Sequence, residues 1–446
     1  MMSRLLGAMR ALLSAVHDRG PKGRMARGIL ANVYDKGAVL LIQLLTIPVL
    51  THAWSVDGYG IWLMLMTVPV YLALSDMGFG TAAGVLLTQS VARGEHDRAV
   101  AILQSTIAFV MATVSVAALA AIGFALWYWR NGRPAGPFFA GEIALSVVFV
   151  TGYALVFVQM SILTVVWRAT HKYAFAMTFA GTWILVEGMV LVMVALASGG
   201  IVIAAMAYFV TRLVGYFVFV QLLRRHESWV KIGVGLADRD LIRALVRPSL
   251  AALSLTGAMA LSLQGVTLAL GAVSGAASVA VFGAARTLSR APLQLAGLLI
   301  RPSIPELTRA LTEGNSQLSG RLNRINLGAT LLTMLPLSLI LINWGPKLVV
   351  IISGGKLAAT TILFVFLTVA ATANAIWSAL ATPLIAMNRQ GEFSTAYLAL
   401  TGLALCIVAT WNNLTVVNAS SIMAIPEVLT LVIVCWCSGA KMKRWT

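Results

Sequence analysis

Long apolar runs follow one another along almost the whole chain, separated by short polar gaps. Most runs reach about 20 residues, the length that an α-helix needs to cross the hydrocarbon core of a bilayer. The pattern predicts twelve membrane-spanning helices, near residues 28–52, 58–80, 100–128, 143–167, 174–197, 201–223, 248–272, 276–300, 326–343, 359–386, 393–411 and 418–438. We therefore expect an all-α polytopic membrane protein.

The second half of the chain repeats a pattern of the first half. Tyr59-Gly60 is followed by Pro69 at the same distance at which Phe282-Gly283 is followed by Pro292. The offset between the two patterns is 223 residues, half of the 446-residue chain. Chance similarity between two apolar helices is the alternative. A repeat of six helices predicts two pseudo-symmetric six-helix bundles of the same orientation, with a cavity at their interface.

The predicted helices divide the chain into five parts. A basic amphipathic segment at 1–26 precedes an N-terminal lobe at 27–223 and a linker at 224–247. A C-terminal lobe at 248–438 and a tail at 439–446 follow. The segment, the linker and the tail are rich in Lys and Arg, and we expect all three on the cytoplasmic side of the membrane.

Composition and charge agree with a membrane protein and exclude two other classes. Hydrophobic residues make up 59% of the chain, charged residues 11%, and the mean hydropathy is +0.90, which excludes an ordinary soluble domain and a disordered chain. The net charge is +17. Of the 32 Lys and Arg residues, 24 fall before the first predicted helix, after the last one or in every second gap between helices. Four fall in the remaining gaps and four within predicted helices. This is the positive-inside rule, which predicts cytoplasmic termini and gives no reason to expect nucleic acid.

The sequence carries none of the enzyme motifs that would indicate catalysis. It has no Walker A sequence and no H-E-x-x-H, and its five histidines lack metal-ligand spacing. The three cysteines all fall within predicted helices, so no disulfide framework is indicated. We predict no catalytic residues, no metal site and no cofactor.

Four cations lie inside predicted helices: Lys36, Arg212, Arg286 and Arg290. A cation at the centre of a bilayer costs about 2.5–3.5 kcal/mol on insertion scales, so each of the four needs compensation. Buried carboxylates can supply part of it, and an anionic cargo can supply the rest. These four residues are therefore candidates for binding an anionic substrate.

Arg286 and Arg290 lie one turn apart on the same face of the predicted eighth helix. Like charges at this spacing repel each other, more strongly in a medium of low dielectric constant. Two adjacent guanidinium groups suit a diphosphate, which each can bind through two parallel hydrogen bonds. Pairing with buried carboxylates is the alternative.

A polar stripe marks the predicted first helix. At 100° per residue its members fall within an arc of about 100°. They are Asn32, Asp35, Lys36, Gln43 and Thr46. The stripe predicts that Asn32, Lys36 and Gln43 line a cavity, and an internal ion pair between Asp35 and Lys36 is the alternative.

Aromatic and acidic residues complete the candidate site. Tyr208 and Tyr216 lie one turn to either side of Arg212, where their rings could stack on sugars and orient the guanidinium; a packing cluster is the alternative. Acidic residues within or at the ends of predicted helices are candidates for ion coupling, with neutralisation of the membrane arginines as the alternative. They are Asp35, Asp76, Glu187 and Glu427.

A family resemblance rests on the second predicted helix. Tyr59-Gly60-Ile61-Trp62, continuing through Pro69 to the run from Leu74 to Gly80, resembles the second helix of polysaccharide and O-antigen flippases. These belong to the multidrug/oligosaccharidyl-lipid/polysaccharide (MOP) exporter superfamily. Asn32, Lys36 and Ile47-Pro48 fit the first helix of that family. The twelve-helix, two-lobe plan extends the resemblance over nearly the whole chain.

The resemblance implies a function and its partners. It implies a flippase of the bacterial inner membrane that moves undecaprenyl-diphosphate-linked sugar repeat units to the periplasmic leaflet for polysaccharide or O-antigen biosynthesis. The units would pass through a cationic central cavity by alternating access coupled to H⁺ or Na⁺. Polysaccharide polymerase machinery would be a partner.

Two other functions remain as alternatives. A multidrug antiporter of the same superfamily would favour an acidic cavity for cationic drugs; the four membrane cations argue against it, and Asp35 argues for it. An integral-membrane O-antigen polymerase or ligase needs a large outer loop for acceptor and catalytic groups. The longest outer gaps, near 129–142 and 344–358, are too short for that role.

Overall fold

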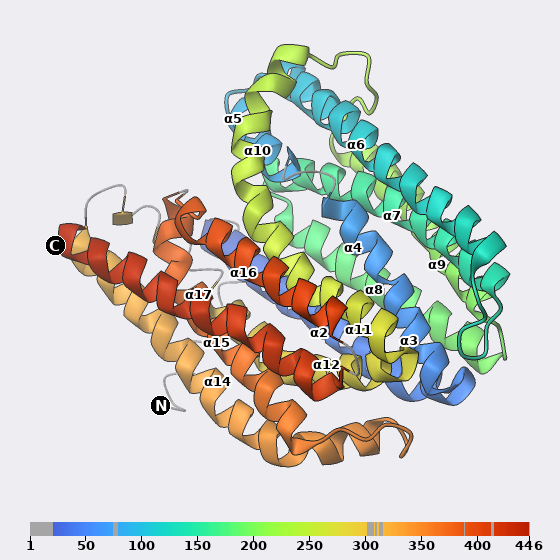
Figure 1. The fold of residues 1–446 in the computed structure, drawn as a ribbon. Helices are drawn as coiled ribbons and strands as arrows, with labels where there is room; N and C mark the ends of the chain where they lie inside the picture. Colours follow the sequence, from blue (N-terminus) through green and yellow to red (C-terminus); the bar gives the residue numbers. More distant parts are fainter. Residues whose placement is uncertain are drawn as a thin grey trace.

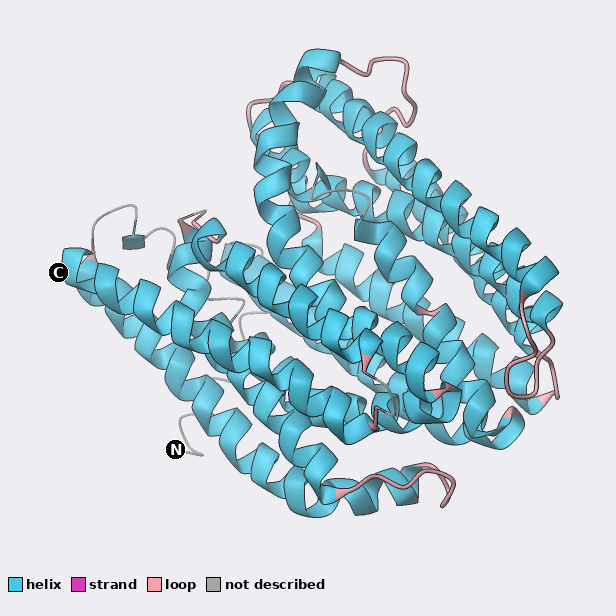
Figure 2. Cartoon of the chain, viewed as in Figure 1, coloured by secondary structure: helices cyan, strands magenta, loops and turns pink. Residues whose placement is uncertain are grey.

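The computed structural model describes residues 21–74, 79–300, 307, 310–311, 315–387, 389–411 and 414–445. Within these ranges the regular elements are helices, and no strand forms (Figure 2). The first half contains α2 (Pro21–Ala53), α3 (Ser55–Leu65), α4 (Thr67–Leu74), α5 (Phe79–Ala92), α6 (His96–Asn131), α7 (Ala140–Ala169), α8 (Tyr173–Leu196) and α9 (Ile201–His226). The second half contains α10 (Arg239–Ala260), the π-helix η1 (Leu261–Gly265), α11 (Val266–Ser274), α12 (Ala276–Ile300), α14 (Ser316–Ile352), α15 (Thr361–Ala386), α16 (Gly391–Thr410) and α17 (Val416–Trp445).

These helices make the chain a multi-pass membrane protein. Eleven helical segments of the described chain are long and apolar enough to cross a bilayer. The remaining predicted span is α12, which has 25 residues but carries Arg286 and Arg290. The predicted all-α polytopic fold is confirmed, and the predicted span missing from the eleven is the one that holds Arg286 and Arg290.

Several helix boundaries differ from the predicted ones. The predicted second helix is broken at Met66, between α3 and α4, because Pro69 has no N–H to donate to the carbonyl four residues earlier. Helices α6 and α14 have 36 and 37 residues, and their polar ends fall outside the apolar windows that predicted them. At 1.5 Å per residue each is about 55 Å long, more than a hydrocarbon core of about 30 Å, so the ends project beyond it or the helices tilt.

The predicted flanking segments are also partly helical. Helix α9 continues to His226 and α10 begins at Arg239, so only 227–238 of the predicted linker is non-helical. Most of the predicted tail belongs to α17. Of the predicted amphipathic segment, residues 1–20 lie outside the described residues, and the part from Pro21 onward belongs to α2.

The two halves form bundles in which equivalent helices make equivalent contacts. In the first bundle α7 packs against α6 and α9, α8 packs against α9, and α2 lies along α8. In the second bundle α15 packs against α14 and α17, α16 packs against α17, and α10 and α11 lie along α16. Figure 1 shows the first bundle in blue to green and the second in yellow to red. This pattern is the predicted pseudo-symmetric pair of bundles.

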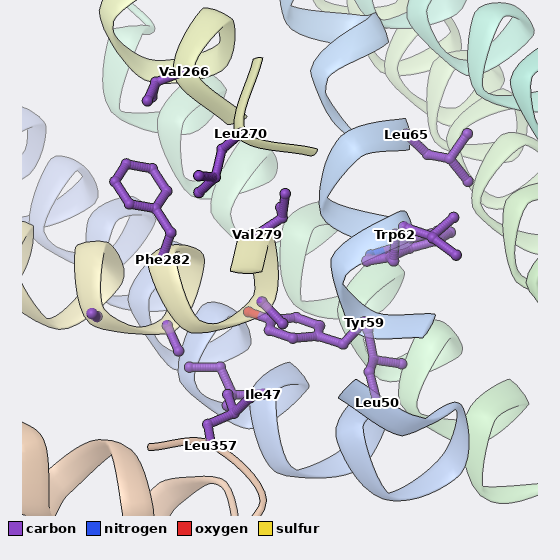
Figure 3. Close-up of a cluster of buried hydrophobic side chains, with 14 of the residues drawn as sticks. Ile47, Leu50, Tyr59, Trp62, Leu65, Val266, Leu270, Val279, Phe282 and Leu357 are labelled. Atoms are coloured by element: carbon purple, nitrogen blue, oxygen red, sulfur yellow. The ribbon is translucent and has the colours of Figure 1, made fainter. Parts of the chain in front are cut away.

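The bundles share a hydrophobic core at one end of the molecule. A cluster of buried side chains there includes Leu50 and Trp62 of the first bundle and Phe282 and Leu357 of the second (Figure 3). This end carries the connections that follow α2, α6, α8, α11, α14 and α16. Toward the opposite end the buried cores are separate, one within residues 72–245 and two within the second bundle. Among the described residues, the core shared by both bundles therefore lies at one end, while toward the other end α10 packs against α5 and α6 of the first bundle.

The repeated aromatic-glycine pair lies at the end with the shared core. Helix α3 of the first bundle packs against α12 of the second. A Cβ atom on Gly60 would overlap with the backbone of Ala276, and one on Gly283 would overlap with the side chain of Leu63. Glycine at both places allows the two helices to approach closely, which explains why both repeats contain it.

Candidate functional site

The polar stripe on α2 is split between buried and exposed positions. The Lys36 ammonium donates to Oδ2 of Asp35 at 2.8 Å, and Asp35 is buried where α2 meets α8. The Tyr173 hydroxyl donates to Oδ1 of Asn32 at 2.9 Å. Gln43 is exposed. The ion pair of Asp35 with Lys36 is the alternative that the sequence left open, and Lys36 therefore has a carboxylate partner.

A second ion pair is buried inside the first bundle. Nη2 of Arg212, on α9, lies 2.6 Å from Oε2 of Glu187, on α8, and the two side chains are 5% and 2% exposed. The same Nη2 donates to the Tyr153 hydroxyl at 2.8 Å, and that hydroxyl lies 3.4 Å from Oε2 of Glu187. Glu187 and Arg212, two separate candidates in the sequence, thus meet and neutralise each other.

The aromatic rings over Arg212 come from α7. The Arg212 guanidinium carbon lies 4.9 Å from the ring centroid of Tyr153 and 5.3 Å from that of Phe157. Tyr208 packs against Trp62 at 5.5 Å, and Tyr216 packs edge-on against Phe217 at 5.9 Å. Sequence spacing pointed to Tyr208 and Tyr216 as the flanking rings. It had no means of finding Tyr153 and Phe157, because they belong to another helix.

The second bundle holds a buried carboxylate of a different kind. Glu427, on α17, is 3% exposed. Its Oε2 accepts from Nδ2 of Asn374 at 3.0 Å and from Nε1 of Trp377 at 2.9 Å, both on α15. Its Oε1 accepts from the hydroxyls of Tyr397, on α16, at 2.7 Å and of Ser262, in η1, at 3.2 Å. Four neutral donors from two helices and the π-helix surround this carboxylate.

Arg286 and Arg290, both on α12, form no ion pair with any residue that the structure describes. Nη1 of Arg286 donates to the backbone carbonyl of Leu263 and to the Thr267 hydroxyl, and its guanidinium lies over the ring of Phe282 at 4.9 Å. The charge of Arg290 interacts with that of Glu427. Among the described residues, however, no carboxylate lies within 4.0 Å of a guanidinium nitrogen of either arginine. Both side chains are partly exposed.

The candidate residues therefore form three separate groups. One joins Asn32, Asp35 and Lys36 to α8, one joins Glu187 to Arg212, and one surrounds Glu427 near the arginines of α12. Asp76 lies outside the described residues. In the described part of the chain no three His, Cys, Asp or Glu side chains gather where they could hold a metal ion. The chemistry available is anion binding on α12 and proton or cation binding at buried carboxylates.

The fold has known counterparts among solved structures. An inward-facing multidrug resistance MATE family transporter of the MOP superfamily is similar with a TM-score of 0.70 at 12% identity, over 93% of this chain and 98% of that one. An outward-facing transporter of the same description is similar with a TM-score of 0.64 at 14% identity, over 96% and 97%.

A third solved structure carries a description that concerns charge. It is a MOP superfamily transporter from Pyrococcus furiosus, similar with a TM-score of 0.65 at 14% identity over 96% of this chain and 97% of that one. Its binding pocket is described as having reverse polarity that suggests a different function. No model of a protein family matches the sequence, and no curated protein sequence matches it. The chain has the fold of the MOP superfamily transporters.

Proposed function

We propose that the protein is a flippase that moves polyprenyl-diphosphate-linked oligosaccharides across the bacterial inner membrane by ion-coupled alternating access. One observation carries the proposal. Of the four membrane cations, Lys36 and Arg212 have carboxylate partners, whereas Arg286 and Arg290 have none within 4.0 Å among the described residues. Two guanidinium groups on one helix face, neither in a direct ion pair among the described residues, favour an anionic cargo with more than one charged oxygen.

The position of α12 supports this assignment. This helix packs against α3 of the first bundle and against α14 and α15 of its own. Charges on it therefore lie close to the boundary between the lobes, where transporters built from repeats bind their substrates. The diphosphate of a lipid-linked sugar would offer several charged oxygens to these two guanidinium groups.

The asymmetry between the two ends of the molecule supports alternating access. The positive-inside rule assigns the end with the shared core, which carries Arg130, Arg133, Lys347 and Lys356, to the periplasm and both termini to the cytoplasm. The separate cores then lie on the cytoplasmic side, where the cargo is made. Rocking the lobes about their interface would part them at the end with the shared core and bring them together at the other end.

The leaflet in which lipid-linked sugars accumulate tests this proposal. Cells that lack the protein are expected to accumulate complete diphosphate-linked repeat units facing the cytoplasm. Units that reach the periplasmic leaflet but stay unpolymerised would indicate a polymerase or ligase instead. Unchanged lipid-linked sugars, together with increased sensitivity to cationic drugs, would favour a multidrug antiporter, for which the solved MATE structures and the buried Asp35 are the supporting observations.

A further inference from the structure

We propose that the loop between α9 and α10, residues 227–238, inserts its apolar tip into the bilayer, and that Lys231 and Arg239 on either side of the tip bind the headgroups of anionic phospholipids. These residues are called the linker loop below. The loop packs on the core of the first bundle and is separate from the arginines of α12. Its attachment, its exposed side chains and its unpaired charges each support a lipid contact.

The linker loop is attached to α6 through two buried side chains. Nε2 of Gln104 donates to the carbonyl of Lys231 at 3.0 Å, and Oε1 of the same side chain accepts from the backbone N–H of Leu236 at 2.7 Å. The Ser105 hydroxyl accepts from the backbone N–H of Asp238 at 2.8 Å. Both Gln104 and Ser105 are buried. Both polar atoms of the Gln104 amide are thus used to hold the loop against α6.

This attachment lies at the depth of a membrane boundary. The opposite end of α6 exposes Trp127 and Trp129, and tryptophan at the end of an apolar helix marks the interface between lipid and water. Gln104 precedes Trp127 by 23 residues, which at 1.5 Å per residue is about 35 Å of helix. The hydrocarbon core of a bilayer is about 30 Å thick, so Gln104 lies close to its other face. The linker loop is therefore held at the level of the headgroups.

The loop has an inner apolar face and an outer apolar tip. Val230 and Ile232 pack on the core of the first bundle, whereas Val234 is 57% exposed and Leu236 55%. The tip, residues 233–237, reads Gly-Val-Gly-Leu-Ala and has no polar side chain. Figure 1 shows the loop beside the start of α6, at the edge of the molecule away from the second bundle. Aliphatic side chains exposed there gain by transfer from water into lipid.

The charges beside the tip are free cations and engaged carboxylates. Lys231 and Arg239 are exposed and form no ion pair with a residue that the structure describes. The carboxylate of Asp238 accepts from the backbone N–H of Asp240 at 2.8 Å, at the start of α10, and the carboxylate of Asp240 lies 3.6 Å from Arg243. One free cation thus lies on each side of the tip. Lys and Arg at this depth attract the phosphates of anionic lipids.

A soluble protein is the other partner that an exposed apolar tip could bind. The attachment to α6 argues against it, because Gln104 and Ser105 hold the loop beside the membrane-spanning part of the helix and not above it. A cytoplasmic protein would have to displace lipid to reach the tip. A phospholipid is already present at that level and offers an apolar chain next to an anionic group.

Electron paramagnetic resonance of a spin label at position 236 tests the insertion. The full-length chain carries Leu236→Cys, with Cys406, Cys435 and Cys437 changed to alanine, in nanodiscs of phosphatidylglycerol and phosphatidylcholine. Collisions of the label with oxygen, which concentrates in lipid, should exceed those with a water-soluble nickel complex. Gln317→Cys, at the exposed start of α14, is the control and should show the opposite order. Preference for nickel at position 236 would overturn the insertion and favour a soluble partner.

Lipid composition and charge test the binding of headgroups. Nickel should reach the label at position 236 less in nanodiscs with phosphatidylglycerol than in pure phosphatidylcholine. Lys231→Gln/Arg239→Gln should abolish most of this difference. Arg321→Gln/Arg324→Gln removes two exposed cations of α14, so it matches the change in net charge and should keep the difference. Equal accessibility in both lipids, or a difference that survives Lys231→Gln/Arg239→Gln, would overturn headgroup binding. No cargo is present, so these outcomes are independent of the flippase assay.

Discussion

The buried polar centres of the two bundles occupy equivalent places but differ in charge. Arg212 lies eleven residues after Ile201, the first residue of α9, and Glu427 lies eleven residues after Val416, the first residue of α17. The centre around Arg212 contains an ion pair with Glu187 at 2.6 Å. The centre around Glu427 contains a carboxylate held by neutral donors.

This difference shows how one fold can assign separate tasks to its halves. A buried ion pair is electrostatically complete, and changing the charge of one member leaves the other uncompensated. The carboxylate of Glu427 accepts only from neutral donors, so replacing it by a neutral side chain breaks no direct ion pair. The first bundle is therefore suited to a fixed structure and the second to a change of state.

Breaking the ion pair of the first bundle should have the largest effect on stability. Arg212→Leu removes the partner of Glu187 and leaves a buried uncompensated carboxylate, which costs about 3–5 kcal/mol. Thermal unfolding of the purified protein measures the loss. The double variant Arg212→Leu/Glu187→Leu should recover most of it. A double variant as unstable as the single one would contradict the view that charge compensation is the role of this pair.

The contact between the bundles should be the next most sensitive feature. Gly60→Ala places a methyl group against the backbone of Ala276, which cannot move aside as a flexible side chain would. We expect the free energy of unfolding to fall by about 1–3 kcal/mol. Gly123→Ala is the matched control. A Cβ at Gly123, on α6, meets no other atom within 4 Å, so alanine there should be neutral or slightly stabilising. Equal unfolding temperatures for the two variants would show that Gly60 is not a contact point.

Neutralising the carboxylate of the second bundle should cost little stability. In Glu427→Gln the amide oxygen can still accept from Trp377 and Asn374, and the amide nitrogen can donate to the two hydroxyls, so we expect a loss of about 1 kcal/mol or less. Ion-coupled transport should nevertheless be impaired, because Glu427 is a candidate for ion coupling. A destabilisation as large as that of Arg212→Leu would remove the contrast between the bundles.

The smallest effect is expected at the ion pair that ties α9 to the loop before α8. Glu227 lies 2.8 Å from Nζ of Lys172. Burial by itself raises the pKa of Glu227, but hydrogen bonds from Lys172 and Trp229 and the charge of Lys172 outweigh it, so the pKa is lowered from 4.5. The stabilisation is therefore fully present above pH 4.5 and is lost as the pH falls through the lowered pKa.

Comparison of the wild type with Glu227→Gln measures this contribution. Because Lys172 is substantially exposed, we expect less than about 1 kcal/mol at neutral pH. The difference in unfolding temperature between the two proteins should shrink as the pH is lowered below 4.5. A difference that grows on acidification would reverse the assigned sign.

Hydropathy predicted the spans well because bilayer thickness dictates helix length, but it could not find helix ends that are polar. The helical residues 316–325 of α14 were assigned to a gap for that reason. The repeat of Tyr59-Gly60 in Phe282-Gly283 predicted two bundles, and the close contact of α3 with α12 explains the glycines.

Pairings between helices could not be read from the sequence. Glu187 and Arg212 are 25 residues apart on neighbouring helices, and their contact depends on how α8 and α9 pack. The surroundings of Glu427 come from α15, α16 and η1, and a π-helix leaves no hydropathy signal. Individual candidates were identifiable as polar residues in apolar helices, whereas their division into paired and unpaired groups required the structure.

The central claim, that Arg286 and Arg290 bind an anionic lipid-linked cargo, is tested most directly in cells whose only copy of the protein carries Arg286→Ala/Arg290→Ala. Arg324→Ala, which changes an exposed arginine on α14, is the control at matched membrane abundance. We expect cytoplasm-facing diphosphate-linked repeat units to accumulate in the double alanine variant but not in the control. They should also accumulate in Arg286→Lys/Arg290→Lys, because a lysine ammonium cannot form the two parallel hydrogen bonds of a guanidinium group. Normal transfer of the units to the periplasmic leaflet in the double alanine variant would contradict the account.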